Sequence, residues 1–312
     1  MTRSSKPASA KLSHLPTEQP NTAAKNLDLR SSLQIARIIN AQDAQVAAAV
    51  KSVLPQIARS IDFIAHALKQ GGRLIYVGAG TSGRLGALDA SECPPTFNTD
   101  PRTVQFIIAG GIKALHIATE ASEDSRQLGQ REMAKRKPCK KDVVVGIAAS
   151  GRTPFTISAV EYARRHGAKT LAVTCNAGSP LEKAAHVAIV ARVGPEVIAG
   201  SSRMKAGSAQ KMILNMLSSG AMTRLGYVYG NLMINVHVKN LKLRERALTI
   251  LRRATGISQD AAKQALRAAA NDVPVALVML QAEVNRKHAR QALKSADGHV
   301  RRAINAARAS QP

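Results

Sequence analysis

Five short apolar runs constrain the fold of this chain more than any other feature of its sequence. They are LIYV after Arg73, VQFIIA from Val104, VVVGIA from Val143, TLAVT from Thr170 and VAIVARV from Val187. Each run has the length of a strand, and most lack the polar alternation of a half-exposed strand, which indicates burial on both faces. Helical patterns such as FTISAVEYARRHG separate several of the runs. This order predicts right-handed βαβ units and an α/β fold, with a five-stranded parallel sheet flanked by helices.

The segments on either side of these runs have a different character. Residues 1–30 mix Ser, Pro, Lys, Asn and Thr without apolar periodicity, which predicts a basic tail followed by an extended arm. Residues 31–253 are expected to form the ligand-binding domain, which opens with a helical layer whose apolar residues recur every three or four positions. Near the C-terminus, Ser258 is a plausible N-cap and Pro274 can open a helix. We therefore expect a small three-helix module over residues 254–307.

The composition narrows the classes of partner. Forty-five Lys and Arg against twenty Asp and Glu give a formal charge of +25, an excess that raises the question of nucleic acid. However, the basic residues are spread over the chain, aromatic residues make up only 3%, and no nucleic-acid motif is present, so base stacking is not expected. We expect a solvated basic surface and an anionic small substrate, and no nucleic acid.

The sequence predicts neither a membrane-spanning segment nor a cysteine-based metal site. No run of eighteen apolar residues occurs, and no apolar segment follows the basic residues of the N-terminus. Neither a membrane span nor a secretory signal is predicted, and we expect a cytoplasmic protein. Cys93, Cys139 and Cys175 are far apart and form no C-x-x-C pair, which argues against a disulfide framework and against a cysteine-based zinc site.

A loop rich in glycine and hydroxyl residues follows the first predicted strand, in the sequence GAGTSGR. It matches G-x-G-x-x-G, but the second strand has no acidic residue near its end to bind a ribose, so a dinucleotide site is not predicted. Exposed amides and hydroxyls at a helix N-terminus suit a phosphate monoester instead. The ligand-binding candidates in this loop are Gly80, Thr81, Ser82 and Gly83.

Two further loops repeat this pattern. The candidates after the third strand are Ser150, Gly151 and Thr153, and those after the fifth strand are Glu196, Ser201, Ser202 and Lys205. Taken singly, each serine is explained at least as well by helix capping, and the lysine by surface charge. Several such loops in one parallel sheet favour a ligand, because ligands bind at the carboxyl ends of the strands.

Carboxyl groups near these loops are the candidates for acid and base catalysis. They are Asp89, Glu92, Glu120, Glu123, Asp124 and Glu196. Glu92 precedes Cys93-Pro94-Pro95, and prolines that force an extended chain would place its carboxylate at a helix end. Glu123 lies beyond the second strand, in ATEASEDS. From spacing alone, a surface charge or a helix-end partner explains any one of these residues equally well.

Four segments together resemble the N-acetylmuramic acid 6-phosphate etherase family of the sugar isomerase (SIS) domain superfamily. They are GGRLIYVGAGTSGRLGALDASECPPTF, EASEDS, SGRTPF and GPEVIAGSSRMKAGSAQKMILNMLS. The resemblance extends from about Leu15 to about Gly298, and it departs from the family pattern at Ala121 and Ser122. It implies a SIS-type sheet, a C-terminal module similar to ubiquitin-associated (UBA) bundles, a homodimer, and no metal or cofactor.

The resemblance also implies an activity. Family members cleave the D-lactyl ether at C3 of N-acetylmuramic acid 6-phosphate, giving N-acetylglucosamine 6-phosphate and D-lactate, in cell-wall sugar recycling. The catalytic glutamates of the family fall on Glu92, as the acid that protonates the ether oxygen, and on Glu123, as the base that removes the C2 hydrogen. Each contributes on the order of 10²- to 10⁴-fold.

Two other functions remain open at this point. SIS domains also occur in non-catalytic sugar-phosphate regulators, including the glucokinase regulatory protein, but a pure sensor has no need of both carboxyls. Nucleic-acid-binding SIS regulators usually carry a helix-turn-helix before the sugar domain, and residues 1–30 are too polar and proline-rich to form one.

Overall fold

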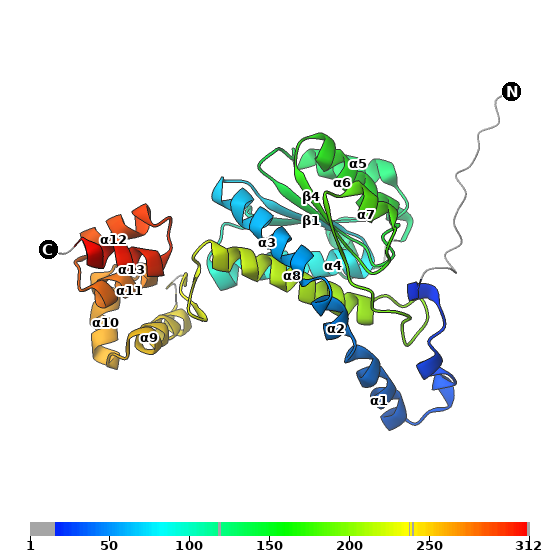
Figure 1. Cartoon of the computed structure of the whole chain (residues 1–312), viewed down its shortest axis with the longest axis horizontal. Helices are drawn as coiled ribbons and strands as arrows, with labels where there is room; N and C mark the ends of the chain where they lie inside the picture. Colours follow the sequence, from blue (N-terminus) through cyan, green and yellow to red (C-terminus); the bar gives the residue numbers. More distant parts are fainter. Residues whose placement is uncertain (1–15, 118–119, 237, 239, 311–312) are drawn as a thin grey trace. The chain divides into compact units, whose positions relative to one another are not determined.

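The computed structural model of the chain describes residues 16–117, 120–236, 238 and 240–310 (Figure 1). The chain divides into two compact units. The sheet unit comprises the residues up to Asp89 together with Gln105–Leu217, and the helical unit comprises Ala90–Val104 together with the residues from Ser218 onward. None of the described helices is both long and apolar enough to cross a membrane.

The sheet unit is built on the predicted five-stranded sheet, and the structure confirms all five strands. They are β1 (Leu74–Gly78), β2 (Val104–Ile108), β3 (Val143–Ile147), β4 (Lys169–Thr174) and β5 (Val187–Val190), in the order β2-β1-β3-β4-β5. The pairs β1–β3, β3–β4 and β4–β5 are parallel. Every residue of β1 and β3 is buried, whereas the edge strand β5 alternates buried and half-buried positions. The inner runs lack polar alternation because helices cover both of their faces.

Small residues let these helices approach the sheet closely. One face packs against α5 (Arg126–Lys135), α6 (Pro154–Arg165) and α7 (Pro180–Ala184), and the other against α3 (Leu54–Lys69) and α4 (Gly80–Phe97) (Figure 1). A Cβ on Gly146 of β3 would lie 2.6 Å from Cγ2 of Val160 in α6. A Cβ on Gly86 of α4 would lie 3.0 Å from the Cβ of Tyr76 in β1. Both helices are therefore seated directly on the strands whose ends carry the candidate loops.

The predicted helical layer before the sheet is only partly formed, because its first helix does not pack against a core of the described residues. The predicted helices are present as α1 (Ser32–Asp43), α2 (Val46–Lys51) and α3, but α1 buries no residue, and Leu33 is 60% exposed. Ser31 and Gln34 form a capping box that starts α1. Local capping thus fixes the helix, while its apolar residues have no core to pack against within the described chain.

The segment expected to be an extended arm is not extended. Its described part forms three single-turn 3-10 helices, η2 (Pro16–Glu18), η3 (Thr22–Ala24) and η4 (Leu27–Leu29). The Asn21 side chain accepts a hydrogen bond from Ala23 N, and Asn26 adopts a left-handed conformation. Asparagines favour such local turns over an extended strand. The expected tail before residue 16 lies outside the described residues.

The two prolines after Glu92 do not end the helix, contrary to the prediction. Helix α4 runs through Pro94 and Pro95 to Phe97. Proline removes the hydrogen bond to the carbonyl four residues earlier but has a helical φ, so it is tolerated near a helix terminus. The chain leaves the helix at Asn98, which has φ +54. Glu92 therefore lies within α4 and not at its end.

Within the described residues of the helical unit, four helices follow Gly256 where three were predicted. They are α10 (Gln259–Ala268), α11 (Val273–Ala282), α12 (Arg286–Ser295) and α13 (Val300–Ala309), preceded by α9 (Leu241–Thr255) and by the short strands β6 (Val228–Tyr229) and β7 (Leu232–Met233). Ser258 and Pro274 open α10 and α11 as predicted. The missed break follows α11, where Glu283 has φ +51 and the Asn285 side chain caps α12.

Candidate active site

Three loops meet at the carboxyl edge of the sheet. Loop 1 (residues 78–83) joins β1 to α4, loop 2 (150–153) joins β3 to α6, and loop 3 (200–204) precedes α8 (Lys205–Arg224). Loops 1 and 2 follow adjacent strands, because β1 pairs with β3. This edge of a parallel sheet is where ligands bind. All three loops belong to the sheet unit.

Glu123 links loop 1 to loop 2. Its backbone carbonyl accepts a hydrogen bond from Phe155 N, in the first turn of α6, at 3.0 Å. Its Oε1 lies 3.2 Å from the position that a Cβ on Gly80 would take. Gly80 has φ +50, so a larger residue there would be strained and would also press on the Glu123 carboxylate. A carboxylate is thereby held over the start of α4, beside the backbone amides of loop 1.

Helix α8 forms the wall behind loop 1. The Ser82 hydroxyl is buried and donates to Oε1 of Gln210 at 2.9 Å. The Thr81 methyl group lies 3.6 Å from the position of a Cβ on Gly207. Ser82 therefore ties loop 1 to α8. Gln210 is 1% exposed, and its Nε2 has no acceptor within the described residues. No sequence signal marked Gln210 as part of the site.

Loop 2 offers one free hydroxyl position and one tight turn. Ser150 Oγ accepts a hydrogen bond from Arg152 N at 3.2 Å, which is a local turn. Gly151 has φ +66, and a Cβ there would lie 2.2 Å from Ser179 Oγ. Thr153 precedes α6 without a side-chain capping bond. Helix capping therefore does not account for Thr153, and its hydroxyl remains a candidate ligand group.

Loop 3 is held by Glu196. The Glu196 side chain is fully buried, and its two oxygens accept hydrogen bonds from Lys205 N at 2.9 Å and Ala206 N at 2.8 Å. These amides open α8, where a negative charge also interacts favourably with the helix dipole. Glu196 was predicted to bind substrate, but the structure gives both of its oxygens to the helix. It acts as a positioning residue that fixes the end of loop 3.

Lys205 is buried at the same place. Its Nζ donates to Oε1 of Gln42 at 3.0 Å, and the residue is 1% exposed. Burial lowers the pKa of the Lys205 ammonium, while the nearby carboxylates of Glu196 and Asp43 act in the opposite direction. An ammonium has three donors, and Gln42 takes one of them. The other two donors leave Lys205 able to bind an anionic or hydroxylated ligand.

The segment after residue 15 also contacts loop 3. Gly200 N donates to Thr17 O at 3.3 Å, and Asn176 Nδ2 donates to Thr17 Oγ1 at 3.2 Å. Asn21 Nδ2 donates to the Pro195 carbonyl at 3.0 Å. Nothing in the sequence places this segment at the ligand edge of the sheet, because these three contacts join it to residues more than 150 positions away.

The remaining carboxylates have separate environments. Asp89 is 5% exposed and accepts hydrogen bonds from Tyr76 Oη at 2.8 Å and Asn215 Nδ2 at 2.7 Å, which fasten α4 to β1 and α8. Asp124 is exposed. The side chain of Glu120 lies outside the described part. Glu92 is exposed on α4, in the part of that helix that belongs to the helical unit.

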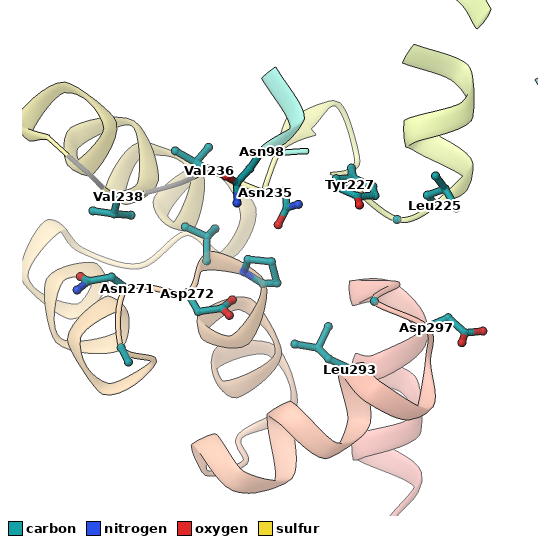
Figure 2. Close-up of a pocket in the computed structure, with 15 residues that line it drawn as sticks. Asn98, Leu225, Tyr227, Asn235, Val236, Val238, Asn271, Asp272, Leu293 and Asp297 are labelled. Carbon is teal, nitrogen blue, oxygen red and sulfur yellow. The ribbon is translucent and has the colours of Figure 1, made fainter. Parts of the chain in front are cut away.

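A separate pocket of about 590 Å³ lies within the helical unit (Figure 2). The side chains of Asn98, Tyr227, Asn235, Asp272 and Asp297 line it together with apolar residues. Asn235 is already bonded to the Phe97 carbonyl at 2.9 Å, and Asp272 caps α11. None of the residues predicted to bind substrate lines this pocket.

Comparison with known proteins adds to this geometry. Residues 56–164 match the family described as Glucokinase regulatory protein N-terminal SIS domain, and residues 131–219 match the SIS domain family. The chain is 56% identical over 274 residues to N-acetylmuramic acid 6-phosphate etherase of Symbiobacterium thermophilum, which covers 88% of this chain and 91% of that protein. It is 50% identical over 289 residues to the protein of the same name in Aeromonas hydrophila subsp. hydrophila, which covers 93% and 97% respectively.

One solved structure supports the fold. A phosphoheptose isomerase from Francisella tularensis superimposes with a TM-score of 0.50 and 19% sequence identity, covering 62% of this chain and 100% of that one. At that identity the likeness concerns the fold alone. The predicted SIS-type sheet, flanked by helices and followed by a helical module, is confirmed.

Proposed function

The chain belongs to the N-acetylmuramic acid 6-phosphate etherase family, and from this premise we propose how its residues carry out the reaction. The enzyme is a carbon–oxygen lyase of cell-wall sugar recycling. It converts N-acetylmuramic acid 6-phosphate into N-acetylglucosamine 6-phosphate and D-lactate. A non-catalytic sugar-phosphate regulator is not favoured, because the similarity to the etherases extends over almost the whole chain.

The observation that carries the proposal is the position of Glu123. Its carboxylate lies over Gly80 at loop 1, and its carbonyl is bonded to the first turn of α6 beside loop 2. A sugar phosphate that engages loops 1 and 2 would therefore present its carbon chain to this carboxylate. Glu123 is the base that removes the C2 proton of the open-chain sugar.

The phosphate and the hydroxyls of the sugar are bound by the loops. Backbone amides and hydroxyls at the N-termini of α4 and α6 form the anion site. Lys205 adds a cation from the start of α8. The proposed binding residues are Gly80, Thr81, Ser82, Gly83, Ser150, Gly151, Thr153, Ser201, Ser202 and Lys205.

The chemistry needs one base and one acid. When the C2 proton moves to Glu123, the electron pair forms an enolate with the C1 aldehyde, and the C3–O bond then breaks. Lactate leaves as a neutral alcohol only if a proton reaches the ether oxygen, and Glu92 donates it. Water next adds its oxygen to C3 of the unsaturated aldehyde and gives its proton to the Glu92 carboxylate, while Glu123 returns a proton to C2. Each carboxyl contributes on the order of 10²- to 10⁴-fold.

The position of Glu92 supports a homodimer with shared sites. Glu92 is exposed and belongs to the helical unit, whereas Glu123 belongs to the sheet unit. We therefore assign the acid of each site to Glu92 of the partner subunit, in a cytoplasmic homodimer. A two-fold axis makes this exchange reciprocal.

Mixing two inactive variants tests this arrangement. Glu92→Gln and Glu123→Gln homodimers are unfolded and refolded together at equal concentration, and D-lactate release is measured. In a mixed dimer one site has both glutamates and the other has neither, so about a quarter of wild-type activity returns if subunits pair at random. No recovery in verified mixed dimers means that both glutamates act within one chain.

A further inference from the structure

A short segment of the chain, residues 16–21, is fastened across loop 3. Thr17 is 1% exposed, its carbonyl accepts from Gly200 N, and its hydroxyl accepts from Asn176 Nδ2. At the other end of the segment, Asn21 Nδ2 donates to the Pro195 carbonyl. Anchors at both ends hold the residues between them in a fixed place at the ligand edge of the sheet.

Glu18 lies between these anchors and faces loop 3. Its Oε2 is 2.9 Å from the position of a Cβ on Gly200, which has φ +77. The residue is half-buried. Within the described residues, Glu18 makes no hydrogen bond and no ion pair, although the chain has 45 Lys and Arg against 20 Asp and Glu. A bound hydrogen-bond donor would give this carboxylate a partner.

The chemistry of a carboxylate narrows what it can bind. An ionised carboxylate only accepts hydrogen bonds, so it matches hydroxyl and amide N–H groups and repels phosphate and carboxylate groups. The substrate of the proposed reaction has two anionic groups and several neutral donors. A neutral donor group of the sugar is therefore suited to the place beside Gly200 of loop 3, where the Glu18 carboxylate lies.

We propose that Glu18 is a substrate-recognising residue, which accepts hydrogen bonds from the hydroxyl or acetamido N–H groups of the sugar beside loop 3. This inference rests on the proposed function, because it assumes a sugar phosphate at the three loops. It makes residues 16–21 part of the binding site.

Kinetics of Glu18→Ala and Glu18→Gln test the proposal, with Glu161→Gln as the matched control. Glu161 lies on α6 and pairs with Arg126 at the surface. For D-lactate release, Glu18→Ala raises KM about ten- to a hundredfold and changes kcat less than about threefold, as expected for loss of a charge-assisted bond. Inhibition by inorganic phosphate stays at the wild-type level in both Glu18 variants, because phosphate does not need this carboxylate.

The phosphate measurement separates recognition from a structural role. If Glu18 only held loop 3 in shape, its variants would lose inorganic phosphate and sugar together, and the proposal fails. Wild-type KM in both variants also overturns it. Calorimetric binding of N-acetylglucosamine 6-phosphate is run in parallel. If the wild type binds this sugar but releases no lactate, the proposed function fails, while weaker binding by Glu18→Ala still supports the role of Glu18.

Discussion

Replacement of Glu196 tests whether its carboxylate stabilises loop 3 by capping helix α8. The buried carboxylate accepts from Lys205 N at 2.9 Å and from Ala206 N at 2.8 Å. A hydrogen bond to a charged group contributes about 1.5–3 kcal/mol, so Glu196→Ala is expected to destabilise the fold by about 3–6 kcal/mol. Glu196→Gln keeps one acceptor but turns an NH₂ group toward a second donor, so this variant is expected to destabilise the fold by about 2–4 kcal/mol.

Thermal unfolding measures this effect. A loss of 1 kcal/mol lowers the Tm of a domain of this size by about 2–4 °C, so Glu196→Ala is expected to melt about 6–24 °C below the wild type. The control Glu161→Gln removes an exposed ion pair, and such pairs contribute about 0–1 kcal/mol. If Glu196→Gln keeps the wild-type Tm and raises KM instead, Glu196 binds substrate and the cap assignment is refuted.

Two further predictions concern cysteine reactivity and acid stability. Cys139 is exposed, whereas burial raises the pKa of the Cys175 thiol to about 12, so alkylation of the native protein followed by mass spectrometry modifies Cys139 and spares Cys175 until the protein unfolds. Modification of both thiols at equal rates would contradict the buried position of Cys175. Burial acts to raise the pKa of Asp142, but the Arg73 hydrogen bonds outweigh it and lower the pKa below 3.8. The Asp142 carboxylate stabilises the folded protein above pH 3.8, and this stabilisation disappears as the pH falls through the folded pKa. The Tm difference between wild type and Asp142→Asn is therefore largest near neutral pH and shrinks below about pH 4. A constant Tm difference down to pH 2 would refute this origin.

The sheet was predictable because its strands are buried on both faces. A strand such as β3, with every residue buried, leaves a continuous apolar run that few other structures produce. The three loops were predictable for a related reason, since ligand loops follow the carboxyl ends of such strands. The turn at Gly80 was found from glycine content, and the role of Thr153 as a ligand group stays a prediction.

Contacts between residues that are far apart in the sequence could not be predicted. The local sequence around Glu196 is compatible with a side chain that binds a ligand and with one that accepts hydrogen bonds from the amides of α8. Only the folded structure distinguishes these two roles. Glu18 and Gln210 enter the site through contacts with distant loops, and their own neighbours in the sequence give no signal. Two helix boundaries were missed, namely the continuation of α4 through Pro94 and the turn at Glu283. Residue preferences in the local sequence give only probabilities for a helix end, whereas packing in the folded protein determines where the helix ends.

The most direct test of the account is D-lactate release from N-acetylmuramic acid 6-phosphate by the purified chain, with Glu92→Gln and Glu123→Gln beside it. The two-carboxylate mechanism predicts lactate release by the wild type and a loss on the order of 10²-fold or more in each variant. If the wild type binds the sugar phosphate and releases no lactate, or if either variant keeps the wild-type rate, the mechanism is contradicted.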